Sequence, residues 1–278
     1  MKANTVGMMN ELRIAAPIGV FDSGIGGLSV LKQVRRLLPA ESLIYVADTG
    51  HLPYGSKHPD YVIQRSLAIS RFLVEQGVKA IVVACNTATA AAIAELRRQF
   101  ALPVIGVEPG LKPGTDLSRG GTIGVLATAG TLGSKKFRRL VSAHGQQYRV
   151  IVQPCHGWVE LVESGALDGS AARERVASLV TPLLQQGADT LVLGCTHYPF
   201  LEPLIRELAG PDVAIVDTGP AIARELQRRL AVSGLLRDGR GRASAYFWAS
   251  GEQLPSERQM ARLWQAGCQW QRLPDGVQ

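Results

Sequence analysis

The feature that most constrains the fold is a regular alternation of short apolar runs with longer amphipathic stretches. Strands that are apolar throughout and separated by helices form parallel sheets covered on both faces, so the sequence predicts an α/β fold. The predicted strands are Ile18–Phe21, Leu43–Ala47, Ala80–Ala84, Val104–Val107, Thr122–Leu126, Arg149–Gln153, Thr190–Gly194, Ala214–Val216 and Ala243–Ala249. The predicted helices are Leu28–Leu38, Asp60–Gln76, Ala88–Gln99, Lys135–His144, Ser170–Gln186, Leu201–Ala209, Ala221–Ala231 and Glu257–Gln265.

Other stretches show neither the apolar run of a strand nor the amphipathic pattern of a helix. Residues 1 to about 16 are interpreted as an extension or arm, and 239–241 as a Gly/Arg-rich turn.

Two pairs of segments repeat along the chain. PIGVFDSGIGGLSVLKQVRRLL at 17–38 resembles GTIGVLATAGTLGSKKFRRLV at 121–141. The second pair is KAIVVACNTATAAAIAELRRQF at 79–100 and DTLVLGCTHYPFLEPLIREL at 189–208. Its members are separated by nearly the same number of residues as those of the first pair, and their similarity aligns Cys85 with Cys195. Strand–turn–helix units look alike in many proteins, so chance similarity is the alternative. The matching cysteines favour two similar half-molecules, which a chain of 278 residues can accommodate.

Composition excludes several classes of protein. The formal net charge is +7, but the basic residues are scattered in pairs on predicted helix faces, and no nucleic-acid-binding motif accompanies them, which argues against nucleic acid as a partner. No apolar run reaches about 18 residues, which predicts no membrane span. The four cysteines lack both framework and zinc-ligand spacing. They favour free thiols in the cytoplasm and no metal site.

Cys85 and Cys195 each directly follow a predicted strand and stand just before a predicted helix. In a parallel sheet this is the carboxyl edge, where ligands bind. A helix N-terminus stabilises a thiolate by only about 0.3–1 kcal/mol, less than one pKa unit, so a second group must assist. His197 is the candidate beside Cys195. A strand-end cysteine is usually a small buried hydrophobe, but two at equivalent places favour reactive thiols. Cys155 and Cys268 lack such a counterpart and are interpreted as structural or incidental.

Two loops add polar groups at the same edge. Phe21-Asp22-Ser23-Gly24-Ile25-Gly26-Gly27 lacks the third glycine of a dinucleotide loop and the lysine of a P-loop. We interpret Asp22 and Ser23 as groups that bind an ammonium and position a thiol, with glycines that let a small ligand approach; a helix cap is the alternative. Pro53-Tyr54-Gly55 suits a rigid loop over a ligand, with backbone amides for a carboxylate, or else a surface turn.

Seven segments together resemble the glutamate racemases of the aspartate/glutamate racemase superfamily. They run in the family's order from about Ile18 to Ala223: FDSGIGGLSVL, ADTGHLPYGSK, ACNTATA, GVEPGLKP, GVLATAGTL, LVESG and GCTHYPFL. The resemblance implies two pseudo-symmetric α/β domains, each a flavodoxin-like sandwich on a parallel sheet, with the active site in the cleft between them and no cofactor. We expect 15–108 plus 219–278 to form the first domain, 109–218 the second, and 1–14 an N-terminal arm.

Carried over by position, the resemblance makes Cys85 and Cys195 the catalytic acid/base pair. Asp22 and His197 would assist them, and Glu163 in LVESG would orient the histidine. The matching substrate-binding positions are Asp22, Ser23, Pro53, Tyr54, Gly55, Asn86, Thr87, Thr128, Thr196 and His197. PCHGWVE at 154–160 departs from the family's apolar run, which concerns the packing beside Glu163.

The expected function is cofactor-independent, two-base racemisation of L- and D-glutamate by a cytoplasmic, homodimeric isomerase that supplies D-glutamate for peptidoglycan. Two alternatives stay open. One is a related activity on aspartate or another amino acid, or a decarboxylase or hydantoin-type isomerase. The other is a non-catalytic ligand-binding or regulatory protein. Some family members bind DNA gyrase, which this sequence does not itself support.

Overall fold

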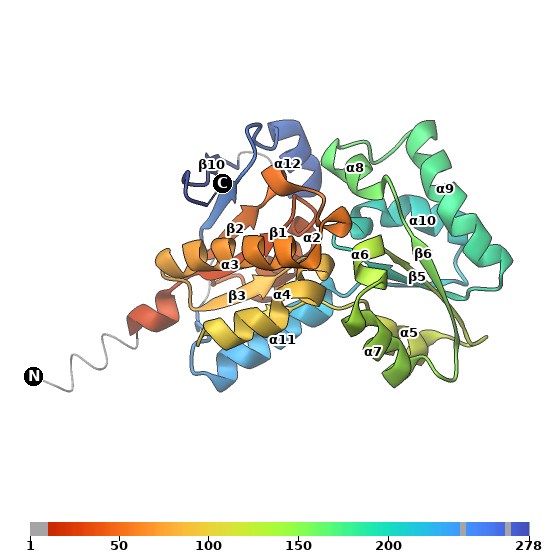
Figure 1. Ribbon diagram of the computed structural model, residues 1–278, viewed down its shortest axis with the longest axis horizontal. Helices are drawn as coiled ribbons and strands as arrows, with labels where there is room; N and C mark the ends of the chain where they lie inside the picture. The colour runs from red at the N-terminus through yellow and green to blue at the C-terminus, as the bar shows by residue number, and fades with distance from the viewer. Residues whose placement is uncertain (1–10, 240–242, 265–267, 278) are drawn as a thin grey trace, which may run out of the picture.

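The fold is built on two parallel β-sheets, seen as two lobes in Figure 1, a computed structural model that describes residues 11–239, 243–264 and 268–277. The predicted α/β fold is confirmed. The strands are β1 (Ile18–Asp22), β2 (Leu43–Ala47), β3 (Ala80–Val83), β4 (Val104–Gly106), β5 (Thr122–Ala127), β6 (Arg149–Pro154), β7 (Thr190–Gly194), β8 (Ala214–Val216), β9 (Ala245–Ala249) and β10 (Trp270–Arg272).

The α-helices are α2 (Leu28–Leu37), α3 (Pro59–Glu75), α4 (Asn86–Gln99), α5 (Leu111–Leu117), α6 (Ala129–Leu132), α7 (Lys135–His144), α8 (Trp158–Glu163), α9 (Ser170–Gln185), α10 (Glu202–Ala209), α11 (Gly219–Val232) and α12 (Glu257–Leu263). Short 3-10 turns are η1 (Thr49–His51), η2 (Tyr54–Ser56) and η3 (Tyr198–Leu201). Within the described ranges, no helix is both long and apolar enough to cross a membrane.

The sequence repeat appears directly in the strand order. The first sheet runs β10-β9-β2-β1-β3-β4 and the second runs β6-β5-β7-β8. The order β2-β1-β3-β4 in one sheet therefore matches β6-β5-β7-β8 in the other, with β1 equivalent to β5 and β3 to β7. Both orders begin as in flavodoxin-like folds. Strands β9 and β10 extend the first sheet beyond β2, so the chain returns to the first lobe after building the second.

Alternate side chains of each strand face different helices. Val20 of β1 packs in the core under α2 and α11, whereas its neighbour Phe21 packs in the core under α3 and α4. In the second sheet, α5 and α7 cover one face and α8, α9 and α10 the other. The core under α2 and α11 continues into the core under α8, α9 and α10. Both sheets are thus covered on two faces, and the carboxyl edge of each strand stays available for a site.

The chain passes between the lobes at two places that lie side by side. One is the segment 107–110, between β4 and α5, and the other is 217–218, between β8 and α11. Gly110 fits tightly against the second segment, because a Cβ atom there would lie 2.7 Å from Val216 Cγ1 and 2.9 Å from Thr218 Cγ2. The two connections therefore form one compact link.

Five parts of the local structure differ from the predictions. Helices α5, α6 and α8 and strand β10 are absent from the predicted elements. They have three to seven residues, too few to show a reliable period. Residues 11–15, expected to be part of an arm, are helical, and Ile14 accepts a hydrogen bond of 2.5 Å from Lys79 Nζ. Residues 1–10, most of the predicted turn at 239–241, and Gln265 lie outside the described residues.

A buried ion pair joins the amino ends of the first sheet. Lys79 Nζ lies 2.5 Å from Glu41 Oε2, and both side chains are almost fully buried. Burial lowers the pKa of Lys79, against the hydrogen bond and charge of Glu41. We expect Lys79→Met to lower the free energy of unfolding by about 3–5 kcal/mol, because it strands a buried carboxylate. Urea unfolding measures this. The double variant with Glu41→Gln should recover part of the loss, and a double variant as unstable as Lys79→Met would contradict the account.

Candidate active site

The carboxyl edges of the two sheets meet, and the predicted site residues lie where they do. Asp22 ends β1, and Cys85 follows β3. In the second lobe Thr128 follows β5, and Cys195 follows β7. Thr196 Oγ1 donates a hydrogen bond of 3.3 Å to Asp22 Oδ2 across the lobe boundary. A charge on Cys195 is among the causes that raise the pKa of Cys85, so the two side chains are near each other. The structure therefore brings the two strand-end cysteines, predicted from the repeat, into one site.

Cys85 occupies the N-cap of α4. Its sulfur accepts a hydrogen bond of 3.4 Å from the Ala88 amide and lies 3.8 Å from Ser23 Oγ, to which the thiol donates. Burial raises the pKa of Cys85 well above its usual value, and the neighbouring charge of Asp22 acts in the same direction. The helix terminus does not offset these effects. Cys85 is therefore a protonated thiol at neutral pH.

Asp22 links the first loop to the second lobe. Its Oδ2 accepts hydrogen bonds from the Gly27 amide at 2.7 Å and from Thr196 Oγ1 at 3.3 Å. Burial raises the pKa of Asp22, although the charge of His197 lowers it. Asp22 therefore holds the turn that opens α2, as the helix-cap alternative expects, whereas its binding of an ammonium and its positioning of a thiol stay predictions.

Cys195 lies at one end of a chain of three side chains. Its Sγ is 3.6 Å from His197 Nδ1, and His197 Nε2 is 2.6 Å from Glu163 Oε1. Ile25 donates its amide to the same carboxylate oxygen at 2.8 Å. Burial lowers the pKa of His197, but hydrogen bonds to Cys195 and Glu163 outweigh it and raise the pKa well above the usual value. A protonated imidazole can donate to the sulfur and to the carboxylate together. Cys195 therefore lies beside the cationic imidazole of His197, whereas Cys85 lies near the carboxyl group of Asp22.

Removing the carboxylate tests this pairing. We expect Glu163→Gln to lower the pKa of His197, because the amide no longer favours the charged ring and burial then opposes protonation. NMR titration of the imidazole ring measures the change. Glu174→Gln, at an exposed position of α9, is the control and should leave the titration unchanged. Identical titration curves for Glu163→Gln and wild type would show that the carboxylate does not set the charge.

The glycines of the first loop accommodate side chains from the other lobe. A Cβ atom on Gly24 would lie 2.0 Å from Glu163 Oε1, and one on Gly26 would lie 2.2 Å from His197 Nδ1. From the sequence, these glycines are expected to let a small ligand approach. In the structure, the groups that approach at Gly24 and Gly26 are the carboxylate and the imidazole.

Three threonine hydroxyls join the lobes on the other side of the site. Thr87 Oγ1 lies 2.9 Å from Thr128 Oγ1 and 3.3 Å from Thr131 Oγ1, and the latter two lie 3.0 Å apart. Thr131 is absent from the sequence prediction. The signal that could have found it is the spacing of Thr128 and Thr131, since Thr128 caps α6 by accepting the Thr131 amide.

The Pro53–Gly55 loop directs its largest side chain away from the second lobe. Tyr54 is buried in the core under α3 and α4, and its hydroxyl donates to Asp48. Arg65 also binds the Asp48 carboxylate, with Nη2 at 2.8 Å and Nε at 3.0 Å. The Tyr54 side chain thus anchors the loop, which leaves backbone groups at this position for a ligand.

A cavity of about 250 Å³ lies beside this loop, at the lobe boundary. It is lined by Pro53 and Gly55 from the first lobe and by Thr128, Cys155 and Glu160 from the second. Two polar residues complete the predicted set. Ser23 Oγ lies 3.5 Å from Asp22 Oδ1, and Asn86 Nδ2 is buried without a hydrogen-bond partner in the described structure. An unpaired buried amide is costly, so Asn86 has a donor available for a ligand.

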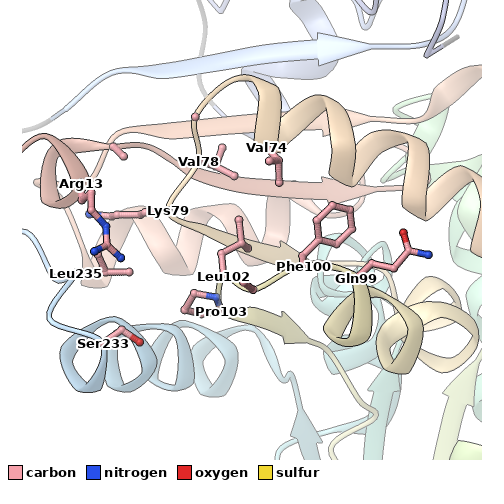
Figure 2. A pocket seen from close by; sticks show the side chains of 13 residues that line it. Arg13, Val74, Val78, Lys79, Gln99, Phe100, Leu102, Pro103, Ser233 and Leu235 are labelled. Atoms are coloured by element: carbon pink, nitrogen blue, oxygen red, sulfur yellow. The ribbon is translucent and has the colours of Figure 1, made fainter. Parts of the chain in front are cut away.

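A larger cavity, about 590 Å³, is separate from this site (Figure 2). Its lining includes Val78 and Lys79, which precede β3, and Leu102 and Pro103, which precede β4. It therefore lies at the amino edge of the first sheet, opposite the edge that carries Asp22 and Cys85. Within the residues that the structure describes, no group of three or more His, Cys, Asp or Glu side chains could hold a metal ion.

Comparison with known proteins agrees with this geometry. The Asp/Glu/Hydantoin racemase family model matches residues 18–226. A glutamate racemase from Methylococcus capsulatus is 56% identical over 260 residues, which is 94% of this chain and 96% of that protein. The crystal structure of glutamate racemase RacE1 from Bacillus anthracis superposes with a TM-score of 0.86 at 33% identity, covering 95% of this chain and 99% of that one. The Escherichia coli glutamate racemase gives 0.82 at 30% identity, covering 92% and 97%. The chain therefore belongs to the Asp/Glu/hydantoin racemase family and, within it, to the glutamate racemases.

Proposed function

We propose that this protein interconverts L- and D-glutamate without a cofactor, using Cys85 and Cys195 as opposed acid and base. One observation carries the proposal: the two thiols stand at equivalent strand ends of two equivalent sheets and enter one buried site. The substrate class is supported by the Escherichia coli relative, whose structure was solved in complex with L-glutamate.

The chemistry follows from the weak acidity of an amino-acid α-proton. A thiolate on one face takes the proton from the α-carbon, and the electron pair stays on a planar carbanion. The thiol on the other face then gives its proton to that carbon, which inverts it. By resemblance to the family, Cys195 deprotonates L-glutamate and Cys85 deprotonates D-glutamate. The resting site suits the first direction, since Cys195 faces the cationic His197 and Cys85 is a protonated thiol.

The polar residues around the thiols would hold the substrate. The buried Asn86 amide and the backbone of the Pro53–Gly55 loop supply donors for carboxylates, and Asp22 lies where an ammonium could be bound. The hydroxyls that complete this set are those of Ser23, Thr87, Thr128 and Thr196. Glu163 would act through His197, by fixing the ring that faces Cys195.

The wider roles follow from the same proposal. We propose that 15–108 plus 219–278 and 109–218 are the two domains, in line with the strands of each sheet. The product D-glutamate would serve peptidoglycan synthesis in the cytoplasm, and the active form would be a homodimer.

An assay of optical activity tests the substrate assignment. Purified protein, without added cofactor, is incubated separately with L-glutamate, D-glutamate and L-aspartate, and circular dichroism follows optical activity. Loss of the signal with both glutamate enantiomers, but not with aspartate, is expected. Loss of the signal with aspartate alone would indicate a related racemase that acts on aspartate. Binding of glutamate by calorimetry with an unchanged signal would indicate a non-catalytic protein.

A further inference from the structure

Helix α12 of the first lobe contacts the end of α8 in the second lobe, and the two lie next to each other in Figure 1. Gln259 Nε2 donates a hydrogen bond to the main-chain carbonyl of Glu163. Arg262 Nη1 donates to the Gly165 carbonyl at 2.7 Å, and its Nη2 lies 2.6 Å from Asp168 Oδ2. Met260 and Leu263 of α12 are themselves buried in the core that continues from the first lobe into the second.

These contacts complete the C-terminus of α8. The last carbonyls of a helix have no partner within it. Those of Glu160, Leu161 and Val162 accept the amides of Ser164, Ala166 and Gly165, in a turn where Gly165 has φ +72°. The Glu163 carbonyl accepts Gln259 Nε2 of α12, and the Gly165 carbonyl accepts Arg262 Nη1 of α12 as well as the Leu167 amide. The end of α8 is therefore capped from the other lobe.

The amide of Gln259 is held in one orientation. Ser256 donates both its amide and its hydroxyl to Gln259 Oε1, at 2.7 and 2.6 Å, in the capping box of α12. With its oxygen bound twice, the side chain presents Nε2 to Glu163. The donor is thus fixed by the start of its own helix.

Glu163 is consequently held at both ends from the first lobe. Gln259 holds its carbonyl, and the Ile25 amide holds its carboxylate, which in turn binds His197. We propose that Gln259, supported by Arg262, is a positioning residue for proton transfer at Cys195, acting through Glu163 and His197. This inference rests on the proposed function, and it assigns to α12 a role in one of the two half-reactions.

The substitution Gln259→Glu is a sharp test. Glutamate can still accept the two Ser256 donors of the capping box, but it places an oxygen against the Glu163 carbonyl where a donor stood. We expect kcat/KM to fall by about 10- to 100-fold, because a small displacement of a reacting group has effects of this size. The fall must be equal in both directions, since enantiomers have equal free energy. The matched control is Gln253→Glu, an exposed position before α12, with unchanged kcat/KM.

Isotope effects show which half-reaction is affected. If transfer at Cys195 becomes the slower step, the deuterium effect on kcat/KM rises with L-[α-²H]glutamate, whose labelled bond breaks in that step. It falls towards the equilibrium isotope effect with D-[α-²H]glutamate, whose label leaves earlier, at Cys85. A merely destabilised fold would not move the two effects in opposite directions. Arg262→Met should give the same pattern more weakly, and it serves if Gln259→Glu does not fold.

The outcomes separate the two proposals. Wild-type protein that fails to racemise glutamate overturns the proposed function itself. Racemisation by wild type, together with isotope effects in the two folded variants that match those of wild type, overturns only the role of α12. Opposite changes in the two isotope effects, with normal behaviour of Gln253→Glu, support it.

Discussion

Replacing Cys195 by serine is expected to reduce racemisation in both directions by about 10²–10⁴-fold, the usual contribution of a general acid or base. A serine hydroxyl is too weak an acid to form the required anion near neutral pH, even beside His197. Cys85→Ser should have a comparable effect, because each turnover uses both faces. Initial rates from each enantiomer, followed by circular dichroism, measure the loss.

The matched control is Cys155→Ser, which makes the same change at a buried cysteine beside the site. Cys155 Sγ donates to the Gln153 carbonyl at 3.3 Å, a bond that a serine hydroxyl can also make. This variant should retain activity. Near-normal racemisation by Cys195→Ser in both directions would refute the two-base mechanism while leaving the fold intact.

The wild-type reaction in deuterated water tests the mechanism without any substitution. Over a short incubation, the product should carry deuterium at the α-carbon and the recovered substrate little. A single base would return label to both, because it would reprotonate the face that it had just deprotonated.

Gly26→Ala is expected to have the second large effect, on a residue that carries no side chain. Its new methyl group would lie 2.2 Å from His197 Nδ1, so the ring must leave the position in which it contacts Cys195. We expect kcat/KM to fall about 10²-fold or more, and the fold to lose about 1–3 kcal/mol through overpacking. Steady-state kinetics and thermal unfolding measure the two effects separately.

Gly276→Ala is the control, because a Cβ atom there meets nothing within 4 Å. Both its activity and its melting temperature should stay near wild type. A Gly26→Ala protein with wild-type kcat/KM would mean that the position of the His197 ring is unimportant for turnover.

The parts of the site that could be predicted from the sequence are those encoded locally. Cys85 and Cys195 each follow a strand with an obvious apolar pattern, and the repeat aligns them, so their shared edge follows from strand direction alone. The same argument holds for Asp22 at the end of β1. The position of a strand's carboxyl end can be found from the residues of that strand alone.

What could not be predicted depends on contacts between distant residues. Ile25 and Glu163 are 138 positions apart, and Glu163 and Gln259 are 96 apart. No period or spacing relates them, so the sequence could not show that Gly24 and Gly26 accommodate side chains, or that α12 caps α8. Helix α8 could not be predicted for a related reason. It follows Gly157 at φ +83° without a side-chain cap, and it is fixed by burial of Trp158 against Tyr198.

The paired connection between the lobes limits how they can move. Two segments that pack side by side, as 107–110 and 217–218 do, leave little freedom for sliding or twisting but permit rotation about a single axis. Rotation about that axis would separate the facing edges, and with them the Thr87–Thr128 contact, without altering either sheet. Cys85 and Cys195, at 5% and 8% exposure, would then meet solvent together and be sealed together. One rotation would thus admit the substrate when the lobes open and exclude water when they close.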